Sequence, residues 1–406
     1  MTRRGTTSRG RAIVVLGAAC WLVAALAGSH ALYPLGIGLV AVTVLALAWV
    51  RLALRRPRLT RRRPPHALVE GDDLEVELLL EPGSGFPLPG AVATDRAGTL
   101  GERTVELAPG QDGLHAGAYV VRDVPRGRHR LGPARLSVAD PFGLAHAETT
   151  LPQQDGVLVY PRLTDLGRLF FEGGGGASDG RRLLLRRPAG FELHSVREYQ
   201  HGESLRRVHW PSTARRAALM VKELEDSPRD ELAVLLDGAE SGASPAPAFD
   251  AAVRVAGSIV LAQVRRGRRC VLVLNTRYRE AQTVASEGPD WQRALDLLAG
   301  AQPDARTSAA ALLASEIGAA SRARQLVVVT SQLAPALVER LVARVLSRRP
   351  AAVVYVDAPT FAGRGASREP GLLRLSAAGV PVAVVRRGDE LADVLAAHQA
   401  PEAVRA

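Results

Sequence analysis

The chain has very little cysteine, lysine or aromatic residue. Among 406 residues there are two cysteines, Cys20 and Cys270, and one lysine, Lys222. Two cysteines, one in an apolar run and one in an expected buried strand, exclude a disulfide framework. Arginine makes up nearly all of the basic residues, which indicates a compositional bias of the genome more than selection for phosphate binding.

Acidic residues are absent from residues 1–63, which contain eleven arginines. The other 41 basic residues equal the 41 acidic residues of the chain, so the net charge of +11 belongs to this N-terminal segment. Because the remainder is formally neutral, it has no broad basic surface of the kind that binds nucleic acid. We therefore expect a membrane, and no nucleic acid, as the partner of the arginine-rich segment.

Two charge-free runs, residues 12–28 and 31–50, lie in this segment. Each approaches the roughly 20 apolar residues that cross the hydrocarbon core. A cleaved signal peptide is the alternative for the first run, but a second run follows it at once. Arginines flank both outer ends, so the positive-inside rule predicts a two-helix anchor over residues 1–63 in the cell membrane, with the rest of the chain in the cytoplasm.

Residues 64–160 alternate short apolar runs with glycine and proline turns, as in DLEVELLLEP. The period of two predicts strands, and the spacing of the turns predicts an immunoglobulin-like β-sandwich. DPFGLA, residues 140–145, has the composition of a tight turn. Residues 161–228 lack strong periodicity, and the run EGGGGASDG at 172–180 is typical of a flexible linker.

Residues 229–400 have a different pattern, in which apolar runs typical of buried parallel strands alternate with helical stretches. The predicted strands are 231–237, 268–275, 324–330, 351–357 and 380–386, and an edge strand is predicted over 279–285. The predicted helices are 249–266, 290–300, 308–322, 334–347 and 389–398. This alternation predicts an open, doubly wound α/β sheet, and hence a multidomain protein.

The densest chemistry lies in REYQHGESLRRVHWPSTARR, residues 197–216, called here the Arg/Trp segment. It contains a spaced pattern formed by Arg197, Glu198, Tyr199, Gly202, Glu203, Arg206, His209, Trp210, Thr213, Ala214 and Arg215. With VYPRL (159–163) and DPFGLA, this pattern resembles the bacterial domain-of-unknown-function 58 family over nearly the whole chain. Glu203 departs from the family, which more often has Asp there.

The resemblance implies a membrane hairpin, a β-rich region, the Arg/Trp segment and a von Willebrand factor A-like domain. Members often lie beside genes for MoxR-type AAA+ ATPases and transglutaminase-like membrane proteins. This neighbourhood implies a protein partner, a MoxR-type ATPase first of all, in an envelope or assembly process. It implies no known reaction.

Von Willebrand factor A domains often hold Mg²⁺ with an Asp-x-Ser-x-Ser run after the first strand and an Asp after the fourth. Here Asp237 and Ser241 match the ends of that run, but Ala239 occupies its middle and Thr330 follows the fourth strand. Hard cations need several oxygen ligands, so we expect no cofactor and at most a degenerate site around Asp237 and Ser241. A Mg²⁺-dependent adhesion-type domain is kept as an alternative.

Three roles are open for the Arg/Trp segment. A hydrolase would use Glu203 and His209, the only acid/base candidates, although no nucleophile has a marked setting. A structural role would pair arginines with carboxylates and use the aromatic residues as packing anchors. The groups concerned are Arg197, Arg206, Arg215, Glu198, Glu203, Glu223, Tyr199 and Trp210. A docking surface would use the same residue types as anchors for a partner. For the segment we favour the structural role, which is compatible with docking. For the whole chain we favour a non-enzymatic, membrane-anchored adaptor that recruits its partner through the von Willebrand factor A-like domain.

Overall fold

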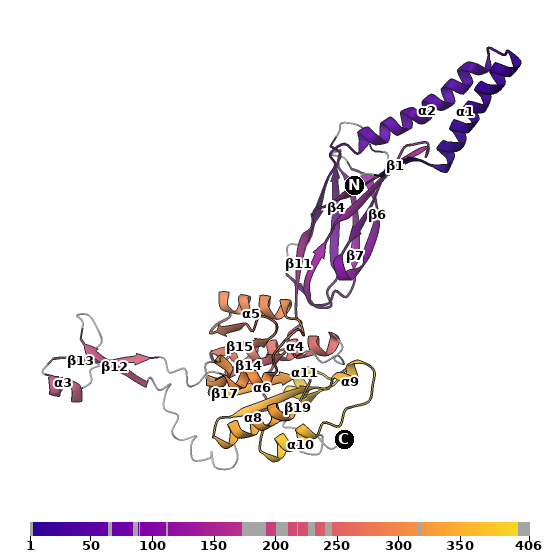
Figure 1. Ribbon diagram of the computed structural model, residues 1–406. Helices are drawn as coiled ribbons and strands as arrows, with labels where there is room; N and C mark the ends of the chain where they lie inside the picture. The colour runs from indigo at the N-terminus through magenta and orange to yellow at the C-terminus, as the bar shows by residue number, and fades with distance from the viewer. Residues whose placement is uncertain are drawn as a thin grey trace. The chain divides into compact units, whose positions relative to one another are not determined.

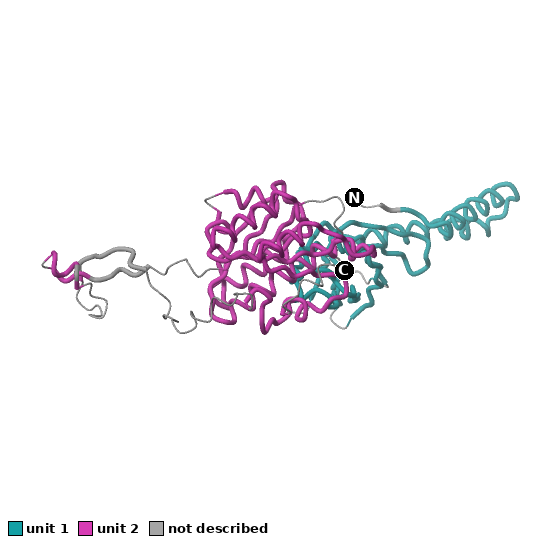
Figure 2. The backbone as a smooth tube through the Cα atoms, turned by 90° about the horizontal axis from the view of Figure 1, so that it is seen from below, with its two compact units in different colours: residues 1–162 teal, residues 163–406 magenta. Residues whose placement is uncertain are grey.

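The structure is a computed structural model that describes residues 3–63, 67–83, 88, 90–110, 113–172, 192–199, 210–216, 218–225, 232–239, 246–315 and 318–396. The chain divides into two compact units, residues 1–162 and residues 163–406, called unit 1 and unit 2 (Figure 2). Unit 1 combines a helical hairpin with a β-rich region, and unit 2 contains an α/β sheet (Figure 1).

The chain begins unit 1 with two apolar helices, α1 (Ser8–Ala27) and α2 (Leu32–Ala53), which pack as a hairpin. Gly17 and Gly36 allow the helix backbones to approach closely, because a Cβ on Gly17 would lie 2.9 Å from the Gly36 carbonyl oxygen. Gly28 ends α1 with φ +63, in the left-handed region that glycine adopts without strain.

Both helices are long and apolar enough to cross a membrane. Their large side chains are widely exposed, with Leu26 at 80% and Leu45 at 67%. An apolar surface of this extent is costly in water, so the two N-terminal helices suggest a membrane anchor. Helix α4 (Ala246–Arg265) has a similar length and hydropathy, but it lies buried in unit 2 and is a core helix.

The β-rich region of unit 1 has a large curled sheet of eight antiparallel strands and a small sheet of three. The strand orders are β1-β10-β9-β5-β6-β7-β4-β2 and β3-β11-β8. The bounds are β1 Arg3–Thr6, β2 Arg58–Arg62, β3 Leu68–Val69, β4 Leu74–Glu81, β5 Ala91–Arg96, β6 Glu102–Pro109, β7 His115–Val121, β8 Gly127–Leu131, β9 Ala134–Ala139, β10 Ala145–Leu151 and β11 Asp155–Tyr160, with a short 3₁₀ turn at Gly98–Leu100.

The predicted β-rich region is confirmed, and its period of two is clearest in β4, where buried and exposed residues alternate. The eight strands form one continuous sheet because β6 pairs with β5 along its length and with β7 through Ala108 and Pro109. The region therefore has two very unequal sheets, unlike the immunoglobulin-like sandwich expected from the spacing of its turns.

Both ends of the helical hairpin enter the large sheet, one at each edge. Strand β1 pairs with β10 just before α1, and β2 pairs with β4 just after α2. The last turns of α2 also join the core of the β-rich region through Ala46, Val50 and Ala53. The arginine-rich stretches on either side of the hairpin are therefore strands of the same sheet, which holds both hairpin ends on one side of the helices.

Unit 2 has a six-stranded sheet in the order β16-β15-β14-β17-β18-β19. All neighbouring strands are parallel except β16, which is antiparallel to β15 as the predicted edge strand required. The bounds are β14 Leu232–Asp237, β15 Cys270–Asn275, β16 Ala281–Val284, β17 Gln325–Thr330, β18 Ala351–Val356 and β19 Val382–Val385. The first strand in sequence thus lies inside the sheet, and the chain crosses over from one side of it to the other.

Helices cover both faces of this sheet, and two hydrophobic cores lie between helices and strands. One face carries α4, α5 (Pro289–Gly300), α9 (Ala358–Phe361) and α11 (Leu391–Ala396); the other carries α6 (Ala309–Ala314), α7 (Ala319–Arg322), α8 (Pro335–Leu346) and α10 (Pro370–Ala377). The helix expected over 308–322 is two short helices, since Ser315 and Gly318, both weaker helix formers than alanine, lie between them.

Residues 163–172 extend unit 2 on the N-terminal side of residue 229. Leu166, Leu169, Phe170 and Phe171 are buried in the same core as α4. Arg266 on the segment after α4 forms an ion pair of 2.5 Å with Glu172. The first part of the stretch expected to be a linker is therefore packed onto the α/β sheet.

Candidate functional site

Polar side chains stand at the ends of three neighbouring strands of the unit 2 sheet. Asp237 ends β14, Asn275 ends β15 and Thr330 ends β17. The parallel register pairs Asp237 with Asn275 across β14 and β15. Parallel strands present their carboxyl ends at one edge, and open α/β sheets bind ligands at the point where the strand order reverses, which here is between β14 and β17.

Asp237 accepts hydrogen bonds on both of its carboxylate oxygens. Asn275 Nδ2 donates to Asp237 Oδ1 at 2.8 Å, and Thr330 Oγ1 lies 2.9 Å from Oδ2. The backbone N–H of Ala239 donates to Oδ1 at 3.2 Å. Asn275 Nδ2 also donates to the carbonyl of Thr307 at 2.9 Å. The carboxylate is therefore held by neutral donors on both of its oxygens.

The surroundings of Asp237 are unfavourable for charge. The residue is 7% exposed, and burial raises the pKa of its carboxyl above the ordinary value of 3.8. The hydrogen bonds from Asn275, Thr330 and Ala239 act in the opposite direction without cancelling the effect of burial.

The described residues do not fit a Mg²⁺ site. Both oxygens of Asp237 accept hydrogen bonds, Oδ1 from Asn275 and Ala239 and Oδ2 from Thr330. Asn275 Oδ1 is a buried acceptor without a hydrogen-bond partner among the described residues, and the oxygens of Asp237 and Thr330 beside it are already engaged in hydrogen bonds. No group of three or more His, Cys, Asp or Glu side chains gathers within the described ranges. Ser241 lies outside those ranges.

The Arg/Trp segment is described in part. Strands β12 (Glu192–Glu198) and β13 (Met220–Glu225) form an antiparallel pair, and the N–H of Tyr199 donates to the carbonyl of Leu219 at 2.8 Å beyond its end. Arg197 and Glu198 therefore lie on β12, and Arg197 is paired in register with Val221. Gly202, Glu203, Arg206 and His209 lie outside the described residues, so the proposed acid/base pair has no geometry to report.

Helix α3 (Trp210–Arg216) presents the aromatic and basic end of the segment. Trp210 is 68% exposed, and Arg215 and Arg216 are exposed on the same helix. Thr213 Oγ1 accepts a hydrogen bond of 3.0 Å from the N–H of Met220, which ties α3 to the first residue of β13. The short helix is thus fixed to the strand pair while its tryptophan remains accessible.

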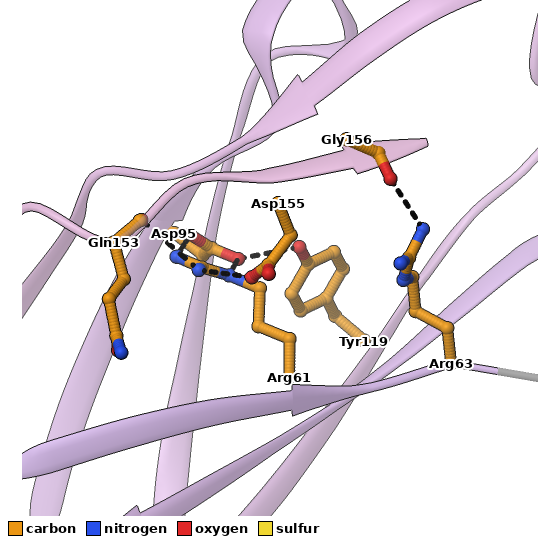
Figure 3. A network of polar contacts seen from close by, with 7 residues as sticks. All are labelled: Arg61, Arg63, Asp95, Tyr119, Gln153, Asp155 and Gly156. Carbon is orange, nitrogen blue, oxygen red and sulfur yellow. Dashed lines mark hydrogen bonds and ion pairs between the residues drawn. The ribbon is translucent and has the colours of Figure 1, made fainter. Parts of the chain in front are cut away.

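A second polar cluster, unforeseen from the sequence, lies in unit 1 (Figure 3). Arg61 on β2 donates to both oxygens of Asp95 on β5, at 2.8 and 2.9 Å, and to Asp155 at 2.8 Å. The hydroxyl of Tyr119 on β7 donates to Asp95 at 2.8 Å. Burial raises the pKa of Tyr119, so its phenol stays a donor. Arg61 and Asp95 lie on strands of the large sheet and Asp155 on a strand of the small sheet, so the cluster links the two sheets at β2, the strand that follows α2.

Asn275 is the residue at the carboxyl edge that sequence analysis missed. A signal was present, because Asp237, Asn275, Thr330 and Asp357 each end or directly follow a predicted buried strand. Asp357 accepts hydrogen bonds from the N–H of Ser367 and lies 3.6 Å from Arg386 Nε. Four polar residues at four strand ends form a row that the pattern alone made visible.

Comparison with known proteins gives a match over a range that contains the Arg/Trp segment and most of the α/β sheet. A family model described as protein of unknown function DUF58 matches residues 195–359, a range from β12 to α9. The uncharacterized protein YeaD of Bacillus subtilis (strain 168) is 27% identical over 296 residues, which cover 69% of this chain and 71% of YeaD. Neither description indicates a catalytic function.

Two solved structures show weak similarity. The CARDB domain of the PF1109 protein from Pyrococcus furiosus, solved with di-metal ions, has a TM-score of 0.17 and 16% identity, and covers 27% of this chain and 92% of that domain. Cwp6 from Clostridium difficile has a TM-score of 0.21 and 9% identity, and covers 82% of this chain and 46% of Cwp6. At these scores neither structure bears on the fold or the function. Residues 195–359 are thus similar to the DUF58 family, and the chain shows distant similarity to YeaD.

Proposed function

We propose that this chain is a non-enzymatic adaptor, anchored in the cell membrane, whose Arg/Trp segment docks a protein partner. The observation that supports it most is Trp210, 68% exposed on a helix that is fixed to β13 through Thr213. Tryptophan and arginine are the residue types most enriched at the energetic centres of interfaces. An exposed tryptophan on a fixed helix that also carries the exposed Arg215 has the form of such a centre.

The α/β sheet of unit 2 is, in this proposal, a von Willebrand factor A-like domain. The support is its topology, in which the third strand is an antiparallel edge and the order by sequence is 3-2-1-4-5-6. Asp237 stands at the end of the first strand, where the metal-binding run of such domains begins. Because Asn275 and Thr330 engage its carboxylate, we assign Asp237 to the structure of the edge rather than to metal binding.

The partner that we propose is a MoxR-type AAA+ ATPase. Its support is the gene neighbourhood implied by the family resemblance, together with the orientation expected from the arginines. An ATPase works where ATP is present, and the positive-inside rule puts the bulk of this chain on the cytoplasmic side. Since residues 64–406 are formally neutral, long-range attraction is weak, and local contacts of the Trp210 kind must provide the affinity.

The test uses the full chain in lipid nanodiscs and the purified MoxR-type ATPase of the same organism, with ATP, with ADP and without nucleotide. Trp210→Ala is expected to weaken binding at least tenfold, about 1.4 kcal/mol, and Arg215→Glu to weaken it as well. Arg216→Glu is the matched control, because Arg216 is exposed on the same helix but lies outside the family pattern.

The melting temperature separates the two roles of the segment. Lost binding with an unchanged melting temperature supports docking. A lower melting temperature for Trp210→Ala would instead show that the segment is a scaffold element, and the absence of binding in all nucleotide states would remove the ATPase as the partner.

A further inference from the structure

The DPFGLA turn, which joins β9 to β10, has no part in the proposed docking function, yet it displays a large aromatic side chain. Phe142 is 73% exposed, and Pro141 beside it is exposed as well. A single exposed phenylalanine is ordinary on a water-facing surface and needs no explanation by itself. The position of Phe142 in unit 1 makes it informative.

The turn is rigid, so the exposure of Phe142 is imposed by the fold. Asp140 is buried and accepts hydrogen bonds from the N–H groups of Phe142 at 2.9 Å and Ala145 at 2.5 Å. Gly143 has φ +66, a conformation that favours glycine. The carbonyl of Asp140 also accepts a hydrogen bond from the N–H of Gly143 at 2.9 Å.

The same turn is fastened to the beginning of α1. The N–H of Thr7 donates to the carbonyl of Leu144 at 2.9 Å, and its hydroxyl donates to the carbonyl of Gly143 at 2.6 Å. Gly10, in the first turn of α1, lies so close to Leu144 that any Cβ there would clash with its carbonyl oxygen. The tip of the β9-β10 hairpin therefore lies at the same height along the axis of α1 as the first turn of that helix.

The charge-free run of α1, residues 12–28, begins at this height. Ala12 begins the run only two residues after Gly10, a rise of about 3 Å along the helix. On α2 the charge-free run continues to Val50, although Ala46 and Val50 are already packed in the core of the β-rich region. The β-rich region thus surrounds the last turn of the apolar run of α2. This is the position expected of a region that enters the headgroup layer of the membrane.

We propose that the turn at residues 140–144 is a membrane-contacting element, with Phe142 seated in the headgroup region of the bilayer that α1 and α2 span. This inference rests on the membrane anchor of the proposed function. Arg9 and Arg11 are exposed on α1 on either side of Gly10, which contacts Leu144 of the turn, and aromatic and basic side chains favour the interface between hydrocarbon and water. The β-rich region would thereby have a third point of contact with the membrane besides the two helices.

Depth measurement by spin labelling tests this directly. The full chain with Cys20→Ala and Cys270→Ala is labelled at Phe142→Cys with a nitroxide and placed in nanodiscs of phosphatidylcholine and phosphatidylglycerol. Collision with oxygen, which concentrates in lipid, is compared with collision with a water-soluble nickel chelate. Leu45→Cys, on an exposed position of α2, reports on the membrane span.

The matched aqueous control is Val120→Cys on β7. Val120 is 45% exposed and pairs with Glu75 of β4, whereas Glu81 at the other end of β4 pairs with Arg58 next to α2. Six residues of strand separate these two pairings, about 20 Å. A label at 120 is therefore on the same β-rich region but well away from the helices.

The expected result is an oxygen-to-nickel collision ratio several-fold higher at 142 than at 120, and lower than at 45. Nickel collision at 142 equal to that at 120, with a lipid signal at 45, would overturn the membrane contact and leave the anchor intact. Low collision with both reagents at 142 would mean that protein covers Phe142, which also overturns the inference. A water-exposed label at 45 would overturn the anchor, and the membrane contact with it.

Discussion

The Arg61 cluster gives the most quantitative prediction. The side chains of Arg61 and Asp95 are 1% and 0% exposed, so neither charge can be rehydrated if its partner is removed. Breaking a buried ion pair on one side costs about 3–5 kcal/mol. We expect Asp95→Ala to lower the stability of the β-rich region by that amount, because it leaves a buried guanidinium and removes the acceptor of the Tyr119 hydroxyl.

Two partners of the cluster serve as graded comparisons. Asp155 lies 2.8 Å from Arg61 but its side chain is 43% exposed, so Asp155→Ala should cost only about 0–1 kcal/mol. Tyr119→Phe removes one hydrogen bond to a charged acceptor and should cost about 1.5–3 kcal/mol. Adding Arg61→Met to Asp95→Ala should recover part of the loss, because it removes a buried guanidinium that is then left with the partly exposed Asp155 as its ion-pair partner.

Hydrogen exchange on the full chain in nanodiscs measures these effects strand by strand. The free energy of opening is obtained from peptides that cover β4 and β5, and β17 in unit 2 is the internal control. A loss below about 1 kcal/mol for Asp95→Ala would refute the reasoning, since the pair would then be dispensable despite its burial. Equal losses of stability for Asp95→Ala and Asp155→Ala would refute the claim that burial makes the Asp95 ion pair stronger than the Asp155 ion pair.

Four further predictions concern the carboxyl edge and the anchor. Asp237→Asn should match or exceed wild-type stability at pH 7, since an amide accepts from Asn275 and donates to Thr330, whereas Asp237→Ala should cost about 1–3 kcal/mol by stranding those donors. Because burial raises the pKa of Asp237, the folded state takes up a proton at a higher pH than the unfolded state does. The free energy of unfolding of wild type should therefore rise relative to that of Asp237→Asn as the pH falls from 7 toward 3.8. A difference in stability that is independent of pH would contradict this. Addition of 1 mM Mg²⁺ should leave the melting temperature unchanged, while a site with a Kd near 10 µM would add about 2.7 kcal/mol that Asp237→Ala removes. A reporter that is active only outside the cytoplasm should stay silent when fused after Ala406, and activity there would reverse the topology.

The α/β sheet was predictable because its strands are buried on both faces. A run such as ELAVLLD has no alternation, which is the pattern of a central parallel strand, and five such runs stand between helical stretches. The curled sheet of unit 1 was harder to foresee. Its edges are formed by Arg3–Thr6 and Arg58–Arg62, whose arginines have the composition of a membrane flank and not of a strand.

The carboxyl edge was half predictable for a related reason. Asp237 and Thr330 follow from their places at strand ends, which sequence pattern locates well. The role of Asn275 depends on register, because it reaches Asp237 only when β14 and β15 pair residue for residue. An asparagine after an apolar run is also typical of a turn, so its place at a strand end became informative only together with the polar residues at the neighbouring strand ends.

Arg61 has one role when the hairpin inserts into a membrane and another in the folded protein. The positive-inside rule counts arginines near an emerging helix, and acidic residues contribute little to it, so Arg61 counts fully when the hairpin inserts. Once the β-rich region has folded, that charge is buried against Asp95 and no longer faces the membrane surface. Strands β1 and β2 can join one sheet only if both hairpin ends lie on the same side. A membrane that these helices cross would therefore be crossed an even number of times, as the arginines predict, and the backbone pairing of β1 and β2 supports this independently of charge.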